Sequence, residues 1–508
     1  MRKLYLLLFI SAIATLTSCR KDFEFETSSG GLQFSKNTVY LDSIFTGISS
    51  STYRLKVYNR SNKDISIPKI ELGNQNSSKF RLMVDGLTGE NGQGKTFNNV
   101  EILANDSLFI FIEATADILD ANPVDFTYND KINFYSSNEV QKVDIVTTIR
   151  DALFIFPNRP LPTGPKETLI INGEDSNIEG HKLSTLDELN WDSDKPYVVY
   201  GYAYVPEGET LTIGAGTNVY FHANSGLIVD KNAKIIINGT DSEKVTFQGD
   251  RLETSFANTP GQWGLVLITS NLDNEINYLT IKNATVGLLL QRSEATTYPK
   301  LNINNSRIYN SSNVGMLART STVTGNNLVI NNAGQVALAC NHGGTYNFTH
   351  STFNNYWSSS NQLSVLINNY IEVDNTIFVQ DLNEANFTNC IIYGSNQIEL
   401  LIEKKENPSI PIAFNYKFKN CLIKFNNVNN QFTNNELYQF TDSTIFEACS
   451  IALNSNQFKP KFENITENKL WLTEHLSLPA DETTAGTLDI KGVTRTIPID
   501  LGAYQYVP

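Results

Sequence analysis

Short runs of alternating apolar and polar residues recur through the middle of this chain and predict β-strands. In 279–282, 306–309 and 390–393 every second residue is apolar or small, so these side chains share one face. The surrounding phrase returns with a period in the twenties, which is typical of a solenoid in which each repeat forms one coil. We therefore expect a stack of parallel strands. The aligned phrases begin at Tyr278, Asn305, Asn327, His350, Asn389, Asn420 and Ala448.

Asparagine marks the position where each predicted strand should bend. Asn283, Asn310, Asn332 and Asn355 occupy it, and Asn tolerates left-handed backbone and can bond to the same amide one coil away. A second apolar run then follows, as at 286–290. Two strands per period joined by an Asn corner predict a right-handed parallel β-helix. A leucine-rich repeat is the competing solenoid, but its Leu-x-x-Leu-x-Leu spacing and its helix are both missing from the pattern.

Alternation before residue 150 has a different spacing and predicts a separate domain. Runs at 53–58, 107–112 and 142–146 are separated by turn clusters rich in Asn and Ser. This order resembles the immunoglobulin-like β-sandwiches found near the anchor of bacterial surface proteins, and the resemblance implies a spacer or docking unit. The expected fold class is therefore all-β, with an immunoglobulin-like β-sandwich, a right-handed parallel β-helix and a C-terminal cap.

Composition shifts set the remaining boundaries. The prolines between 157 and 165 make a stiff connector, and an uncovered solenoid end would expose a sheet edge that needs a cap. The predicted segments are a signal peptide at 1–18, a lipidated Cys with a charged tether at 19–30, the sandwich at 31–150, a linker and N-terminal cap at 151–196, the β-helix at 197–460 and the C-terminal cap at 461–508.

Charge and composition narrow the class of partner. The 508 residues carry a formal net charge of −14, which argues against nucleic acid and, more weakly, against a polyanionic glycan. The chain holds about 60 Asn, more than its 39 Lys and Arg together, and they crowd into the second half where solenoid corners are expected.

The N-terminus predicts export and a lipid anchor. Arg2 and Lys3 precede an apolar stretch that is too short to span a bilayer but suits a signal-peptide core. The stretch ends in Leu16-Thr17-Ser18-Cys19, which resembles a bacterial lipobox and implies acylation of Cys19. The alternative is an ordinary signal peptide with a chance Cys.

The charged segment 20–26 resembles the export tether of Bacteroidetes surface lipoproteins. We therefore expect lipid anchoring in the outer membrane with the protein facing the cell exterior; the alternatives are a plain solvated linker and the periplasmic face.

Four cysteines remain after Cys19, and an even number in an exported chain invites disulfides. Three of them, however, occupy one inward column where Ser306 and Ser351 also stand. Stacked side chains of parallel strands point the same way, so buried free thiols are favoured over bridges. The pattern holds no Cys-x-x-Cys pair or His cluster, so we expect no metal and no cofactor. The four cysteines are Cys340, Cys390, Cys421 and Cys449.

Several phrases together carry a family resemblance. The runs 211–221 and 261–267, the phrase 350–357 and the closing stretch 489–505 resemble pectate-lyase-like right-handed β-helix proteins from Bacteroidetes. The resemblance covers roughly 197–508 and implies the β-helix architecture. It implies little about activity, because such proteins differ widely in what they do.

The catalytic signatures of two relevant enzyme classes are missing from the sequence. Polygalacturonase-type β-helices need clustered Asp residues, yet the chain holds no Asp-Asp pair and no Asn-Thr-Asp, Gly-His-Gly or Arg-Ile-Lys phrase. Pectate lyases need an acidic cluster for calcium, and the repeat columns show none.

The best candidate chemistry lies where the second strand ends in three consecutive coils. If the repeats stack in register, six polar residues should line one edge within about 10–12 Å. Arg and His beside amides can bind a sugar carboxylate or abstract a proton next to it. The alternative is that solenoid strand ends are polar because they meet water. The six are Gln291, Arg319 and Asn341, followed by Arg292, Thr320 and His342.

Aromatic residues offer a second kind of candidate. Tyr356 and Trp357, with Trp263 and Tyr298, could form platforms for a sugar ring, or they could pack as core and cover.

These observations predict a lipid-anchored surface protein that is non-catalytic. It should bind a glycan, or serve in an assembly with outer-membrane proteins, through its β-helix. Its other partner is the lipid bilayer, and nucleic acid is excluded. The alternative is a polysaccharide lyase or glycoside hydrolase with Arg292, Arg319 and His342 as the catalytic candidates. The ligand-binding candidates are Gln291, Asn341, Tyr356 and Trp357.

Overall fold

The structure, a computed structural model, is all-β, as predicted. It divides into two compact units, the first ending at Asp151 and the second running from Ala152 to Pro508. The signal peptide and Cys19 lie outside the described residues, so lipidation stays a prediction. None of the helices in the described ranges is long and apolar enough to cross a membrane. The structure describes residues 24–159, 164–171, 173–293, 298–357, 361–407, 410–454 and 456–508.

The first unit consists of two sheets that share one hydrophobic core. In the smaller sheet alternation explains the burial of Leu55 and Val57, whereas in the larger sheet Ile67 and Ile70 lie three residues apart and are both fully buried. The immunoglobulin-like identity of this unit stays a prediction. The larger sheet holds β1 (Glu26–Thr27), β6 (Ile65–Leu72), β10 (Thr127–Tyr135), β11 (Val140–Arg150) and β3 (Thr38–Tyr40), with β4 (Ile44–Phe45) on β11 and β8 (Thr96–Ile102) on β6. The smaller sheet holds β2 (Gln33–Phe34), β5 (Tyr53–Tyr58), β9 (Ser107–Ala114) and β7 (Phe80–Val84).

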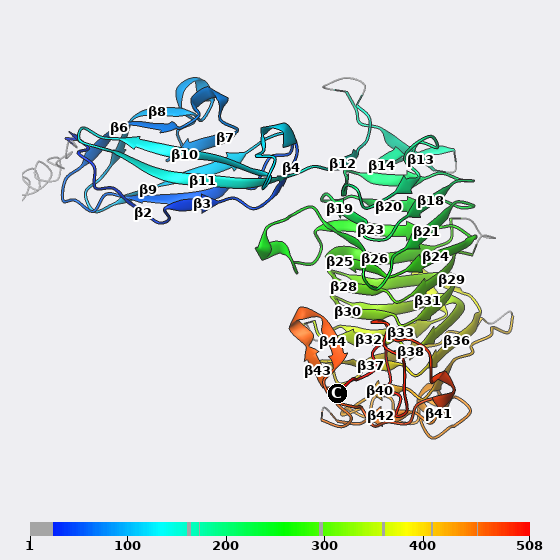
Figure 1. Cartoon of the computed structure of the whole chain (residues 1–508). Coiled ribbons are helices and arrows are strands. Elements are labelled where there is room, and N and C mark those ends of the chain that lie inside the picture. Colours follow the sequence, from blue (N-terminus) through cyan, green and yellow to red (C-terminus); the bar gives the residue numbers. More distant parts are fainter. Residues whose placement is uncertain are drawn as a thin grey trace, which may run out of the picture. The chain divides into compact units, whose positions relative to one another are not determined.

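The second unit is a stack of coils with three faces of parallel strands (Figure 1). The first face is a continuous sheet of eleven strands. The second and third faces are joined, because β29 and β31 run without a break around the corner between them. The predicted parallel β-helix is thereby confirmed.

The first face contains β12 (Leu153–Ile155), β16 (Tyr197–Val199), β19 (Asn218–Phe221), β22 (Val245–Gly249), β25 (Leu279–Lys282), β28 (Arg307–Ser311), β30 (Val329–Ala333), β32 (Thr352–Asn355), β37 (Ile391–Gly394), β40 (Leu422–Lys424) and β42 (Ser450–Ala452). The second contains β14 (Glu174–Lys182), β17 (Tyr202–Val205), β20 (Gly226–Val229), β23 (Trp263–Ile268), β26 (Ala284–Gln291), β29 (Val314–Asn326), β31 (Val336–Thr349), β33 (Leu363–Asn368) and β38 (Leu400–Glu403). The third contains β15 (Asn190–Trp191), β18 (Thr210–Ile213), β21 (Lys234–Asn238), β24 (Asp273–Asn277), β27 (Lys300–Asn304), the later parts of β29 and β31, β36 (Leu382–Thr388), β39 (Lys417–Lys419) and β41 (Phe446–Glu447).

The repeated phrase stacks in register, coil upon coil. Ile308 pairs with Ile330, and Ile330 pairs with Phe353, in successive strands of the first face. All three side chains are at most 1% exposed and point into the same core. Each such side chain contributes about 1.5–3 kcal/mol by leaving water, so the column provides much of the force that holds neighbouring coils together.

Two columns of left-handed residues turn the chain at the ends of the first face. Asn283, Asn310 and Asn332 have φ of 66°, 56° and 56°, and the amides of Asn310 and Asn332 each donate to the preceding Asn at 3.3 Å. The predicted amide ladder is thus confirmed for these three and wrong for Asn355, which bonds instead to the main chain of Ala333. The other column explains the start of the repeated phrase: its members have φ between 46° and 53°. These members are Tyr278, Asn305, Asn327, His350, Asn389, Asn420 and Ala448.

The four cysteines after Cys19 are free thiols, in agreement with the sequence argument. Cys390, Cys421 and Cys449 each donate a weak hydrogen bond to a main-chain oxygen, for example Cys421 Sγ to Phe387 O at 3.3 Å. They behave as small core side chains.

The solenoid starts earlier than the sequence indicated. Residues 151–196 were expected to be a linker and cap, yet β12, β14 and β15 pair in parallel with β16, β17 and β18 of the next coil. They form the first coil. The alternating runs in these strands are too short to be told apart from a loop by sequence pattern. They are strands because they pair with the strands of the following coil.

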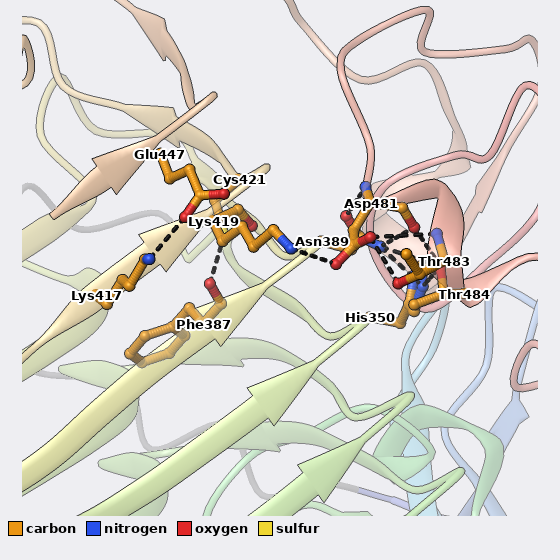
Figure 2. A network of polar contacts seen from close by, with 10 residues as sticks. All are labelled: His350, Phe387, Asn389, Lys417, Lys419, Cys421, Glu447, Asp481, Thr483 and Thr484. Carbon is orange, nitrogen blue, oxygen red and sulfur yellow. Dashed lines mark hydrogen bonds and ion pairs between the residues drawn. The ribbon is translucent and has the colours of Figure 1, made fainter. Parts of the chain in front are cut away.

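Residues 461–508, expected to cap the last coil, instead form a strap along the outside of the first face. Asn468 Nδ2 donates to Asn310 Oδ1 at 3.1 Å, and Arg495 Nη2 donates to Asn327 Oδ1 at 2.9 Å. In Figure 2 the strap residue Asp481 meets Lys419 at 2.6 Å, and its N–H bonds Asn389 at 2.8 Å. The corner amides therefore bind the strap as well as each other.

Aromatic residues of the segment 425–446 fill the end of the last coil instead. Phe425, Phe432, Tyr438 and Phe440 pack together with ring centroids 4.7–6.2 Å apart. Tyr438 OH also accepts from the main-chain N–H of Ile402 at 2.6 Å. This cluster hides the apolar end that a cap was expected to cover.

Candidate functional site

The structure brings the predicted strand-end residues together at the corner between the second and third faces. Gln291 is the register partner of Arg319, and Arg319 is the partner of Asn341. Arg319 Nε donates to Asn341 Oδ1 at 3.2 Å and Nη1 donates to Gln291 Oε1 at 3.0 Å. We call these three residues the cationic edge. Its amides hold the guanidinium from both sides and fix its orientation.

The next coil extends the cationic edge through Asn368, which the sequence argument missed. Asn368 Oδ1 accepts from Asn341 Nδ2 and from the main-chain N–H of His342, both at 2.9 Å. Asn368 ends β33, which pairs with β31, so it continues the same column. Asn368 follows Asn341 by 27 residues, close to the 28 residues between Gln291 and Arg319, so the end of the apolar run 363–367 is the signal that could have predicted it.

Left-handed backbone turns the chain just after the cationic edge. Thr320 has φ 45° and His342 has φ 58°. Thr320 Oγ1 donates to His342 O at 2.8 Å, and it lies 3.1 Å from His342 Nδ1. Because the hydroxyl proton goes to the carbonyl, Nδ1 carries the ring proton and donates to Oγ1. The other ring nitrogen, Nε2, therefore carries a lone pair.

His342 sits too deep to act on a substrate as predicted. The residue is 6% exposed, and its buried Nε2 contacts no donor among the described residues. Its pKa falls to about 4, because burial disfavours the charged ring and because Arg292 and Arg319 repel it. The ring is therefore neutral at physiological pH and supports the corner.

Arg319 combines partial burial with an unbalanced charge. Its guanidinium lies within 4 Å of none of the carboxylates in the described ranges, and both of its held donors face neutral amides. Burial lowers the pKa of Arg319, although an Arg side chain stays protonated. A half-buried cation without a counter-charge is a site for an anion.

An aliphatic stripe adjoins the cationic edge on the outer surface of the second face. Leu289, Leu317, Ala339 and Leu366 are consecutive register partners there. The three leucines are only partly buried. The surface next to Arg319 is therefore apolar and would suit a ligand that has both a carbon-rich face and an acidic group.

The other predicted residues lie apart from this arrangement or serve the core. Arg292 lies next to Gln291, with its guanidinium 6.0 Å from the Tyr298 ring. Tyr356 packs against the strap with Val329 and Tyr504, so it covers the solenoid. Trp357 is half-buried beside Gly334.

Trp263 is a core residue. It is 1% exposed, stacks on Phe221 at 4.4 Å and donates to Lys282 O at 2.9 Å. In the part of the chain that the structure describes, no group of three or more His, Cys, Asp or Glu residues could hold a metal ion.

Residues 183–289 match the model of a pectate-lyase like beta helix domain. That segment runs from the first coil through most of β26, which ends at Gln291, so it stops short of Arg319 and Asn341. The match supports the coil architecture for a minor part of the chain. No curated protein matches the chain.

Two solved structures are weakly similar. A family 123 glycoside hydrolase from Clostridium perfringens is similar over 24% of this chain and 30% of that chain, at 10% identity and a TM-score of 0.16. A PapD-like domain of human CEP192 is similar over 27% of this chain and 96% of its own length, at 12% identity and a TM-score of 0.16. The chain thus spans less than a third of the hydrolase, and TM-scores this low carry no argument.

Proposed function

We propose that this protein binds an acidic glycan without turning it over, and that the cationic edge receives a uronic-acid carboxylate. We further propose that a lipid on Cys19 holds the protein on the outer membrane, facing the exterior. The first unit, as an immunoglobulin-like sandwich, would then be the spacer or docking unit. An acidic chain of net charge −14 can still bind an anion where its local charge is positive.

The observation that carries the proposal is the unbalanced guanidinium of Arg319. Amides hold Nε and Nη1 at 3.2 and 3.0 Å, so the group is oriented before a ligand arrives. A carboxylate that reaches the remaining donors would offset the cost of the half-buried charge and form charge-assisted hydrogen bonds. The neighbouring leucines would contact the carbon-rich face of the sugar ring.

Geometry favours binding over catalysis. Abstraction of a proton next to a carboxylate requires a base that reaches the substrate, and the lone pair of His342 Nε2 is buried. With a pKa of about 4, this ring is also a weak base. Cleavage by a pair of carboxylates would need two acids flanking the ligand, and none of the cationic-edge residues is acidic.

The test is calorimetric titration with oligogalacturonate, with carboxyl-reduced oligomers of the same length as the neutral control. We expect the charged oligomer to bind and Arg319→Ala to weaken it at least about tenfold, the effect of losing about 1.4 kcal/mol. Arg251→Ala, which removes an arginine in the segment between β22 and β23, is the matched control. Equal binding of charged and reduced oligomers, or unchanged binding by Arg319→Ala, would refute the proposal.

The second candidate is a polysaccharide lyase in which Arg292 and Arg319 bind the carboxylate of the sugar that is cleaved. A lyase leaves an unsaturated sugar that absorbs ultraviolet light, so the same oligomers can be followed for new absorbance. Product that disappears in both Arg292→Ala and Arg319→Ala would establish catalysis. Partners in an outer-membrane assembly would appear instead in a pull-down from native membranes.

A further inference from the structure

The last coils contain a recessed site at the corner between the first and second faces. It is a groove of about 520 Å³ that crosses three successive coils at the segments 361–363, 396–398 and 426–431. Eight of its eleven lining residues are Asn or Gln, and the other three are Leu363, Ile398 and Val428. We call it the amide groove. None of these lining residues carries a charge.

We propose that the amide groove binds a neutral oligosaccharide. Each carboxamide offers a donor and an acceptor in one plane, which matches the paired hydroxyl groups of a sugar ring. The exposed Val428 and the half-buried Leu363 and Ile398 supply apolar contact for its carbon-hydrogen face. A charged ligand would find no counter-charge in the groove and would lose its hydration there without replacement.

The groove walls are organised before a ligand arrives. Asn426 Nδ2 donates to Gln397 Oε1 at 2.6 Å, and Asn396 Nδ2 donates to Gln362 O at 2.6 Å, so amides of neighbouring coils hold one another. Amides fixed in this way lose little conformational entropy when they bind a ligand. Neighbouring coils are about 4.8 Å apart, a spacing comparable with the length of one pyranose unit along a sugar chain.

One buried group of the wall lacks a protein donor. Gln362 is 1% exposed, and its Nε2 donates to Trp357 O and Ser395 Oγ, both at 2.8 Å. Its Oε1 accepts no hydrogen bond from the described residues. Gln362 lines the groove, and a ligand hydroxyl that reached this acceptor would satisfy it.

The amide groove and the cationic edge lie at opposite ends of one strand. Leu363 begins β33 at the groove, and Asn368 ends it at the cationic edge. Five residue steps place them roughly 16 Å apart, so each site can be altered without touching the other. The inference shares with the proposed function the idea of a glycan ligand, and its test separates the two sites.

The test uses the full chain, neutral tetrasaccharides of the cello, malto and manno series, and oligogalacturonate, each titrated by calorimetry. Gln397→Leu with Asn429→Leu removes two exposed amides at similar volume. Asn383→Leu, an exposed amide on the third face, is the matched control. We expect one neutral series to bind, the double variant to weaken it at least about tenfold, and Arg319→Ala and Asn383→Leu to leave it unchanged.

Each other outcome has a distinct meaning. No binding by any neutral series, or neutral binding that survives the double variant, overturns the inference even if oligogalacturonate still binds at Arg319. If Arg319→Ala loses the binding of oligogalacturonate and keeps that of the neutral series, the result supports the proposed function. The amide groove is then judged by the binding of the neutral series only. Capture of an extended peptide in the groove, lost in the double variant and not displaced by sugars, would also overturn the inference.

Discussion

Replacing Glu399 with Gln should make the protein more stable at high pH. Glu399 is fully buried directly before β38, where its Oε2 accepts from Ser364 Oγ at 2.8 Å and its Oε1 accepts from Asn396 N at 2.7 Å. Burial raises the pKa of this carboxyl to about 8, although its hydrogen bonds and the Lys424 charge oppose the shift. The folded protein therefore holds a proton that the unfolded chain releases.

The sign follows from linkage. The folded pKa of about 8 lies above the ordinary value of 4.5, so the stability that this group contributes is fully present below pH 4.5 and is lost as pH rises toward 8. At about 1.36 kcal/mol per pH unit the full difference is about 5 kcal/mol, of which about 3 kcal/mol is lost by pH 7. The amide introduced by Glu399→Gln keeps an acceptor for the Asn396 N–H and cannot ionise.

The assay is urea unfolding at pH 5, 7 and 8.5. We expect Glu399→Gln to resemble the parent at pH 5 and to exceed it by a few kcal/mol at pH 8.5. Glu463→Gln, which changes an exposed acid of the strap, is the control. Its free energy of unfolding should change with pH as that of the parent does.

The reasoning is refuted if the free energies of unfolding of Glu399→Gln and of the parent change with pH in the same way. Such a result would mean that the folded state keeps the carboxylate ionised against Lys424. The nearby titratable groups are Lys424, Tyr356 and Tyr393, and Lys424 Nζ already donates to Gly394 O at 2.7 Å.

Three further predictions concern the solenoid. Gly394→Ala should lower the free energy of unfolding by about 1–3 kcal/mol, measured by urea titration, because the new Cβ would lie 2.3 Å from Glu399 Oε1; an unchanged midpoint would contradict this packing. Asn327→Ala should cost about 2–3 kcal/mol and speed proteolysis of the strap, because Arg495, which is 1% exposed, loses an acceptor at 2.9 Å; strap cleavage at the parent rate would count against it. Cys340 should resist Ellman's reagent until denaturant is added, because burial raises the pKa of its thiol; rapid labelling of the native protein would show that the reagent reaches this thiol in the folded state.

Local pattern was enough to predict the coils. Alternation assigned Ile308, Ile330 and Phe353 to one inward face, because a strand's side chains repeat every two residues. The Asn at the corners followed from the left-handed backbone that a tight bend requires. The edge formed by Gln291, Arg319 and Asn341 followed from the same register, because each of them ends the second strand of its coil although the coils between them are 28 and 22 residues long.

Only the tertiary structure decided the contacts between segments that lie far apart in the sequence. Asn368 joins Arg319's column through its hydrogen bond with Asn341, and the amide groove assembles from three separate coils, so neither is visible in one stretch of sequence. The strap contacts the first face across more than a hundred residues, as Arg495 does with Asn327. His342 looked like a base in the sequence, but its burial made it neutral and inaccessible. Sequence specifies which way a side chain faces along its own strand, whereas solvent access and distant neighbours depend on how the whole chain packs.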